Sequence, residues 1–408
     1  MKHCFHAADI LLPGHISMTR WACIACDQFS SQMDYWERVQ AVVAESPSTY
    51  HMIYPEALLR QGNPETRIAS IHQTMRDYLA AGLFETHRRS FIYLERVVPG
   101  GVRRGLIGQI DLEEYDFTPG SGARIRATEG TVRERIPPRV KLLEGAAMEF
   151  PHTIMLCDDH ADVIMQAAAS AKGEKVYDFE LMEDGGHITG WTISGLGVSL
   201  VNSAVSEYEK EMETQQGTKR PMLFAVGDGN HSLASQKACW EAIKPTLSPE
   251  EQLEHPARYA LVELENIHDP AITFAPIHRV VKGIRPEGLL ERLRVMAVPQ
   301  GHPITCVTAA GKETLFLDAQ QSPLAVAILQ PILDDYVRRF GGAMDYIHGE
   351  DVVYALAKGE DSLGIILPGM EKSALFPGVL QGGVLPRKTF SMGQAREKRY
   401  YLEGKKRI

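Results

Sequence analysis

The sequence contains little that is typical of a secreted or membrane-bound protein. Only six cysteines occur in 408 residues and they are scattered, so we expect reduced thiols rather than a disulfide framework. No apolar run approaches the roughly 20 residues that a membrane-spanning helix needs. The first residues show no secretory signal. We therefore expect a cytoplasmic protein with no membrane partner.

Outside the C-terminus, acidic residues clearly outnumber basic ones. The net charge of -9 argues against nucleic acid as a partner, because binding a phosphate backbone needs a basic face. Residues 387–408 hold eight Lys or Arg and two Glu, a charge of +6, which leaves -15 for the rest of the chain. Two interpretations of this basic segment stay open. It docks on its own protein or closes over an anionic ligand, or it is a solvated terminal segment.

A polar, glycine-flanked turn interrupts the apolar run that begins at Leu223. The residues Gly227-Asp228-Gly229-Asn230-His231-Ser232 follow a strand-like segment and precede helix-forming sequence, which predicts a strand, a tight turn and a helix start. We expect the two glycines to take backbone angles closed to other residues and Ser232 to cap the helix. Amide groups of the first helical turn then favour an anion, most often phosphate.

This turn carries neither of the common phosphate-binding fingerprints. No Walker A lysine follows the glycines, and no third glycine stands at the dinucleotide spacing. What remains is a carboxylate and an imidazole. Asp228 is suited to hold a divalent metal or a hydroxyl, and His231 to contact phosphate or exchange a proton. The alternative is a structural turn in which Asp228 bonds its own backbone and His231 only caps.

Three further segments supply candidate cations and acids. His278 and Arg279 offer a proton-transfer group beside an anion clamp, although such a pair at a strand entrance is common. Residues 385–393 place two cations, including Lys388, and two hydroxyls in one bend that could surround phosphate oxygens. The alternative is that this bend is only a surface turn. Residues 124–139 are rich in arginine. Their guanidinium groups bind a polyanionic ligand, or they form internal ion pairs to Glu129 and Glu134. The arginines of this last segment are Arg124, Arg126, Arg133, Arg135 and Arg139.

Two other motifs have plainer interpretations. Cys23 and Cys26 have the spacing of a redox motif, but no second cysteine pair completes a zinc site, and we expect core packing. Asp158, Asp159 and His160 follow an apolar run, where strand ends often carry metal or catalytic groups. A polar loop is the simpler prediction there.

The chain resembles a widespread bacterial family, the domain of unknown function numbered 1015, nearly end to end. Five segments carry the resemblance: 8–13, 24–29, 126–131, 225–234 and 385–393. The turn is also similar to the Asp-Gly-His-His-Arg motif of the ParB and sulfiredoxin superfamily, which includes free-serine kinases. By that match Asp228, Gly229 and His231 fall on motif positions, while Asn230 and Ser232 replace a histidine and the phosphate-clamping arginine. Lys237, Arg279 or an arginine of 124–139 would then substitute.

The leading hypothesis is a nucleotide- or phosphate-binding enzyme that transfers a phosphoryl group to a small hydroxylated metabolite, with ATP or ADP and Mg²⁺ as cofactors. Asp228, His231 and His278 are the expected catalytic residues, and Asp228 is also the metal ligand. Two alternatives stay open: a metal-dependent hydrolase built on the same three residues, or a non-catalytic metabolite-binding regulator. Expected partners are a small anionic ligand and, as one option, a second copy of the chain. The expected phosphate-binding residues are Gly227, Gly229, Asn230, Ser232, Arg126, Arg279 and Lys388.

For the fold we expect α+β architecture with mixed sheets and flanking helices, a ParB/sulfiredoxin-like core with N- and C-terminal additions. Length predicts two or three domains, which we place at 1–150, 151–300 and 301–408. The segment 174–202 alternates as strands do, and 201–212 reads as a helix. Further predictions are helices over 33–44, 65–83, 284–298 and 323–340 and a hairpin of 91–98 with 106–112.

Overall fold

The computed structural model describes residues 3–59, 61–130 and 136–407. The chain folds into two units, the first made of residues 1–127, 131–272 and 394–408, the second of 128–130 and 273–393. The boundary that we expected near 150 lies inside the first unit, and the one near 300 inside the second. The chain leaves the first unit and returns to it, so the units do not correspond to three consecutive regions.

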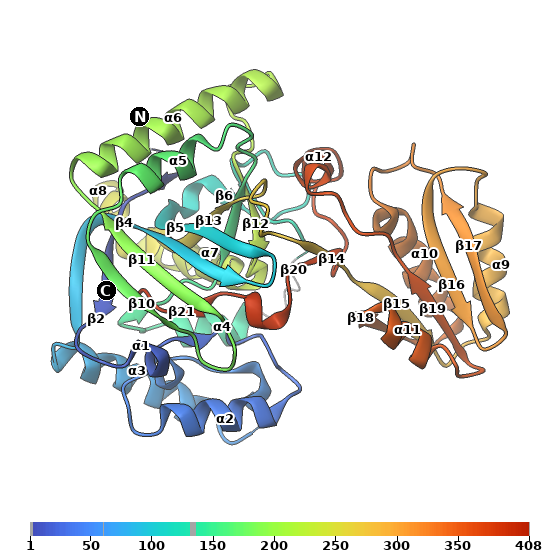
Figure 1. The fold of residues 1–408 in the computed structure, drawn as a ribbon, viewed down its shortest axis with the longest axis horizontal. Helices are drawn as coiled ribbons and strands as arrows, with labels where there is room; N and C mark the ends of the chain where they lie inside the picture. Colours follow the sequence, from blue (N-terminus) through green and yellow to red (C-terminus); the bar gives the residue numbers. More distant parts are fainter. Residues whose placement is uncertain (1–2, 60, 131–135, 408) are drawn as a thin grey trace. The chain divides into compact units, whose positions relative to one another are not determined.

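The first unit is built on an eleven-stranded sheet (Figure 1). The strand order is β10-β11-β4-β5-β13-β9-β12-β7-β6, with β1 on β5 and β2 on β4. The pairs β13–β9, β12–β7 and β6–β7 are parallel and the others antiparallel, which confirms the mixed sheet. The strands are β1 Phe5–His6, β2 Ala8–Pro13, β4 Phe84–Val98, β5 Gly101–Asp111, β6 Tyr115–Asp116, β7 Ile125–Arg126, β9 Ile154–Cys157, β10 Lys175–Glu180, β11 His187–Ile193, β12 Phe224–Asp228 and β13 Tyr259–Asn266.

Helices flank this sheet. The pair α5 and α6 lies on one side of it, and α1, α2 and α3 gather on the other (Figure 1). Trp21 and Trp36 from these N-terminal helices share a hydrophobic core with Ile92 and Leu94 of β4. The helices are α1 Met18–Trp21, α2 Met33–Val43, α3 Pro64–Ala80, α4 Ile136–Leu143, α5 Val163–Ser170, α6 Leu196–Gln216, α7 Asn230–Ile243 and α8 Pro249–Glu254.

Most of the basic C-terminal segment, from residue 394 onward, belongs to the first unit. Strand β21 (Tyr400–Tyr401) pairs with β3 (Cys23–Ile24), and β22 (Lys405–Lys406) pairs with β8 (Met148–Glu149). Its cations meet buried acids: Arg399 lies 3.0 Å from Glu263, and Arg407 lies 2.9 Å from Glu149. Burying a charge is costly unless it is paired, so these acids explain why Arg399 and Arg407 are buried rather than solvated.

The second unit contains a five-stranded antiparallel sheet of order β17-β16-β19-β15-β18. A separate pair, β14 with β20, joins residues near both ends of the unit. The strands are β14 Phe274–Pro276, β15 His278–Lys282, β16 His302–Thr308, β17 Gly311–Leu317, β18 Ala343–Ile347, β19 Ser362–Ile366 and β20 Phe390–Met392. The helices are α9 Pro286–Met296, α10 Ala325–Phe340, α11 Glu350–Leu356 and α12 Leu375–Gly382.

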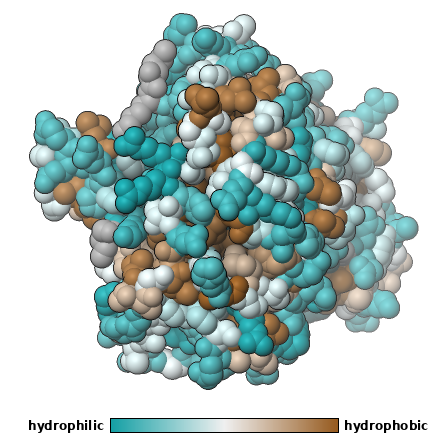
Figure 2. Space-filling model, turned by 60° about the vertical axis from the view of Figure 1, so that its left-hand side comes forward, coloured by the Kyte–Doolittle hydropathy of each residue, from teal (hydrophilic) through white to brown (hydrophobic). Residues whose placement is uncertain are grey.

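On the face drawn in Figure 2, hydrophilic side chains predominate and hydrophobic ones form several small, separate areas. None of the helices in the described part of the chain has both the length and the apolar character that crossing a bilayer requires.

Candidate functional site

The predicted strand, turn and helix are present as β12, the turn and α7. Asp228 is the last residue of β12, and Gly227 lies at a register irregularity in its pairing with β9. Gly229 precedes α7 with a φ of 84°. A Cβ on Gly229 would lie 3.0 Å from both His152 Cδ2 and Thr153 Cα, so both the backbone angle and the space require glycine here.

Ser232 does not cap the helix, which corrects the prediction. The residue at the N-cap is Gly229, and no side chain caps this end. Because Gly229 takes the left-handed conformation, α7 already begins at Asn230, and Ser232 lies inside its first turn. Asn230 is buried and His231 half-buried, and both interact with other residues of the protein.

A lysine from the C-terminal segment faces the turn. Lys398 Nζ lies 3.5 Å from Asp228 Oδ1, and the two side chains are 7 % and 20 % exposed. The second carboxylate oxygen, Asp228 Oδ2, is buried without a hydrogen-bond partner among the described residues, and so is the hydroxyl of Thr153. Buried polar atoms are rarely left unpaired in native proteins, so these two mark a place where a ligand is expected.

Beside the turn lies an ion pair between a buried histidine and a half-buried aspartate. His152 Nε2 is 3.2 Å from Asp27 Oδ2, and the side chains are 5 % and 27 % exposed. Burial disfavours the charged imidazole, but the carboxylate of Asp27 outweighs it and raises the pKa of His152 well above its usual value. The same contact lowers the pKa of Asp27 against the opposing effect of burial. The pair is therefore charged at neutral pH.

Cys26 and Tyr401 complete this cluster. The Tyr401 hydroxyl lies 2.5 Å from His152 Nδ1 and donates a hydrogen bond to Cys26 Sγ at 3.3 Å. Cys26 Sγ is itself 4.0 Å from His152 Nδ1. Cys23 is buried in the core as predicted, whereas Cys26 is partly exposed. Cys26 nevertheless packs against the same hydrophobic core, so the prediction of core packing holds for both cysteines.

A pocket of about 90 Å³ connects this cluster with α7. Ser232 and Gln236, one turn apart on α7, line it together with Cys26, His152 and Arg139. Gln236 Oε1 is another buried atom with no hydrogen-bond partner within the described ranges. Arg139 forms an ion pair with Glu56 at the same place.

Most of the predicted cations lie elsewhere or are already paired. Arg126 is in β7 beside Ala225 of β12, and its Nε donates to the carbonyl of Ala123. Arg124 lies 3.2 Å from Glu209. Thr131, Arg133, Glu134 and Arg135 lie outside the described residues.

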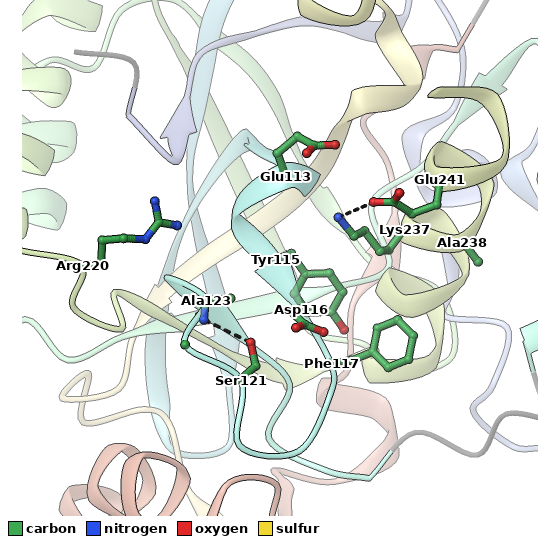
Figure 3. A pocket seen from close by; sticks show the side chains of 11 residues that line it. Glu113, Tyr115, Asp116, Phe117, Ser121, Ala123, Arg220, Lys237, Ala238 and Glu241 are labelled. Carbon is green, nitrogen blue, oxygen red and sulfur yellow. Dashed lines mark hydrogen bonds and ion pairs between the residues drawn. The ribbon is translucent and has the colours of Figure 1, made fainter. Parts of the chain in front are cut away.

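Lys237, expected as a substitute clamp, lines a different pocket. That pocket has a volume of about 490 Å³ and lies between α7 and the loop 113–123 (Figure 3). Lys237 Nζ is 2.7 Å from Glu241 and donates to the carbonyl of Leu112. Its charge is therefore used within the protein.

The remaining candidates belong to the second unit. His278 is buried and accepts a hydrogen bond at Nδ1 from the amide of Leu367, and burial lowers its pKa, so the imidazole is neutral. Arg279 is fully buried and donates to the carbonyls of Arg387 and Lys388. These hydrogen bonds give Arg279 a structural role, because they hold the bend at residues 386–388. The side chain of Lys388, in the same bend, is exposed.

Of the predicted trio, Asp228 and His231 lie in the first unit and His278 lies in the second. Across residues 3–59, 61–130 and 136–407, one group of three His, Cys, Asp or Glu residues has its ligand atoms close together: Asp158, His160 and His268. Sequence reasoning also missed Lys398, His152 and Asp27 as parts of the site around the turn. Only long-range contacts bring these residues together. Asp27 lies in the segment 24–29 that carries the family resemblance, whereas no such segment contains His152 or Lys398.

Comparison with known proteins gives one family and several remote likenesses. Residues 13–336 match the model of a family described as "Protein of unknown function (DUF1015)". No protein of curated function matches the chain.

Several solved structures show a remote similarity. SbnI with a C-terminal truncation from Staphylococcus aureus is 11% identical over 70% of this chain and 82% of that one, with a TM-score of 0.38. A conserved hypothetical protein from Pyrococcus furiosus is 11% identical over 72% and 90%, with a TM-score of 0.34. A free serine kinase variant in complex with ADP is 12% identical over 72% and 90%, with a TM-score of 0.39. The predicted family is confirmed by the match over residues 13–336.

Proposed function

Because the chain belongs to the DUF1015 family, whose function is unknown, we propose a function from the site itself. The start of α7 binds the phosphate groups of a nucleotide, ATP or ADP, and the protein transfers a phosphoryl group to a small hydroxylated metabolite. The observation that carries this proposal is the meeting of Asp228, Lys398 and the glycine turn in front of α7.

Each part of this arrangement favours an anionic ligand. A helix start presents backbone amides and the positive end of the helix dipole, which together suit phosphate. The absence of a side chain at Gly229 lets a phosphate approach the backbone closely. Lys398 adds a buried positive charge, which strengthens its attraction to phosphate oxygens. In the proposed site Lys398 takes the place of the motif arginine that Ser232 replaces.

The residues at the turn also fit Mg²⁺. Magnesium sites in such enzymes use one or two carboxylates together with substrate phosphates, and Asp228 Oδ2 is a buried carboxylate oxygen without a partner in the described part of the chain. Asp228 would hold the ion, which when bound neutralises charge on the phosphates. Lys398 offsets the rest of that charge, and His231 on the first turn of α7 contacts a phosphate oxygen. Positioning and electrostatics supply most of the catalysis in such reactions.

Calorimetric titration with nucleotide tests the proposal. We expect the full-length protein to bind MgADP or MgATP saturably with one site per chain, and to bind ADP more weakly when magnesium is removed. No binding at millimolar nucleotide would contradict the proposed function.

Cys26 favours a second candidate function in the pocket of about 90 Å³ beside the turn, acyl transfer through a thiol. A cationic imidazolium beside a partly exposed cysteine is the setting of reactive thiols, and Asp27 holds His152 in place. In the reaction, Cys26 Sγ bonds to the carbonyl carbon of an ester or thioester, and the bond to the leaving oxygen or sulfur breaks. The His152 imidazolium donates a proton to that leaving group, and the thiol proton replaces it through the Tyr401 hydroxyl.

Alkylation by iodoacetamide tests this second function. We expect Cys26 to react first, because the other five cysteines are buried and serve as internal controls. His152→Gln is expected to slow the reaction by about tenfold or more, since the substitution removes the positive charge beside the sulfur. Equal reaction of Cys26 in the wild type and in His152→Gln would contradict the role of the thiol.

A further inference from the structure

A cluster of two histidines and one aspartate lies at the opposite end of β9 from the Asp228 turn. Asp158 and His160 follow the end of β9, and His268 follows the end of β13. These two strands are hydrogen-bonded neighbours and run parallel, so their C-terminal ends meet at one edge of the sheet. The topology therefore brings together residues that are more than 100 positions apart in the sequence.

The distances within the cluster suit one ion. His268 Nε2 lies 2.7 Å and His160 Nε2 lies 3.6 Å from Asp158 Oδ1. One ligand atom from each residue lies within 4.8 Å of the others. Ligand atoms bound to tetrahedral zinc at about 2.0 Å are separated by about 3.3 Å. The two observed distances fall on either side of that value, so small side-chain movements would admit the ion.

The backbone that carries these ligands is held by other residues. Asn266 Nδ2 donates to the carbonyl of Asp159 at 2.8 Å and to Asp162 Oδ1 at 2.9 Å, which ties the loop after β9 to β13. Arg104 forms ion pairs with Asp162 at 2.7 Å and with Asp269 at 3.0 Å, joining the same two loops a second time. The loops are therefore pre-organised by contacts that leave Asp158, His160 and His268 available.

The three side chains differ in their exposure to solvent. Asp158 and His268 are 18 % and 27 % exposed, and His160, which is 61 % exposed, lies against His268 with ring centroids 4.0 Å apart. An ion entering from solvent would thus meet two fixed ligands and one outer ligand.

We propose that Asp158, His160 and His268 form a binding site for a divalent transition metal, zinc above all, with a coordination position left for water or a small anion. Two imidazoles and one carboxylate suit zinc, and three protein ligands with an open position are characteristic of reactive rather than purely structural zinc sites. Because β9 has four residues, the site lies about 13 Å along the strand from the Asp228 turn. It is therefore independent of the proposed nucleotide site.

Metal titration of the full-length protein tests this site. After treatment with a chelator and dialysis, we expect calorimetry to show one equivalent of Zn²⁺ bound and Co²⁺ to give the visible absorption of a tetrahedral site. His160→Ala and His268→Ala are each expected to weaken zinc binding by about tenfold or more, since even changes outside the ligand set cost that much. Circular dichroism checks that each variant is folded. Because His160 is exposed, His160→Ala is less disruptive to the fold than His268→Ala.

His187 provides the matched control. It is an exposed histidine that lies 2.6 Å from Asp178 and 2.8 Å from Glu180, so it offers similar groups outside the proposed site. We expect His187→Ala to retain stoichiometric zinc. Absence of stoichiometric zinc in the wild type, or the same loss in His187→Ala as in His160→Ala, would overturn the proposal. Asp228→Asn should leave zinc binding unchanged, which separates this test from that of the nucleotide site.

Discussion

Asp228→Asn is expected to reduce phosphoryl transfer by about 100-fold or more, the size of effect seen when one preorganised electrostatic group is removed from an active site. The substitution keeps the shape of the side chain but removes its charge. The proposed metal ligand is then lost, and Lys398 faces a neutral amide at 3.5 Å instead of a carboxylate. The measurement is the rate of ADP formation from ATP with a panel of hydroxylated metabolites.

The same chemical change elsewhere in the chain controls for nonspecific effects. Asp345 forms a 2.7 Å ion pair with Lys282 in the second unit, and both side chains are partly exposed. Asp345→Asn should therefore retain the wild-type rate. Asp228→Asn protein that folds normally and turns over at the wild-type rate would remove Asp228 from the reaction.

Asp27→Asn is expected to destabilise the first unit by about 3 kcal/mol, because removing the carboxylate leaves the charge of the buried His152 uncompensated. His152 is 5 % exposed and keeps only the Tyr401 hydroxyl and the Cys26 thiol beside it. Urea unfolding followed by tryptophan fluorescence measures this directly. All four tryptophans of the chain, Trp21, Trp36, Trp191 and Trp240, lie in the first unit and report on it selectively.

The contribution of this pair to stability depends on pH in a definite direction. The pKa of Asp27 is lowered on folding, so its contribution is present above the unfolded value of about 3.9 and is lost as pH falls through the folded value. The pKa of His152 is raised on folding, so its contribution is present below about 6.5 and is lost as pH rises through the folded value. The difference between wild type and Asp27→Asn should be largest between about pH 4 and 6.5.

An exposed pair supplies the control for this measurement. Asp178 and His187 are in contact at 2.6 Å but lie at the surface, where solvent screens their attraction. Asp178→Asn should leave the unfolding midpoint almost unchanged. A loss in Asp27→Asn no larger than that in Asp178→Asn, or one that grows in alkaline solution, would contradict the assignment of His152 and Asp27 as a charged pair with a buried histidine.

Local sequence patterns predicted most elements correctly. The hairpin of β4 and β5, the helices α2, α3, α9 and α10, and the strand, turn and helix at the site all appear where the sequence indicates. The alternating pattern of 174–202 was misleading at its end, because α6 already begins at Leu196 after Gly195 takes a positive φ. Ser232 was assigned as a cap because hydroxyls favour that position, but the left-handed Gly229 starts the helix earlier.

The site itself was only half predictable. Asp228 and Gly229 belong to a local motif, whereas Lys398 reaches the turn from 170 positions away in a segment whose charge was the only sign of a role. Asp27 and His152 are single residues in unrelated stretches, and pairing of β9 with β12 places His152 beside Gly229. Arg279 was predicted to bind phosphate because a guanidinium group suits anions. In the structure the same group donates hydrogen bonds to backbone carbonyls of the second unit.

The most direct test of the nucleotide site is a calorimetric titration of MgADP into the wild type, Lys398→Met and Lys406→Met side by side. Lys406 lies in the same basic segment but is exposed, so its substitution matches the charge change without touching the turn. We expect binding in the wild type and Lys406→Met, and a loss of about tenfold or more in Lys398→Met, as for a charge-assisted hydrogen bond of about 1.5–3 kcal/mol. Equal affinities of all three proteins, or no affinity in any, would contradict phosphate binding at the start of α7.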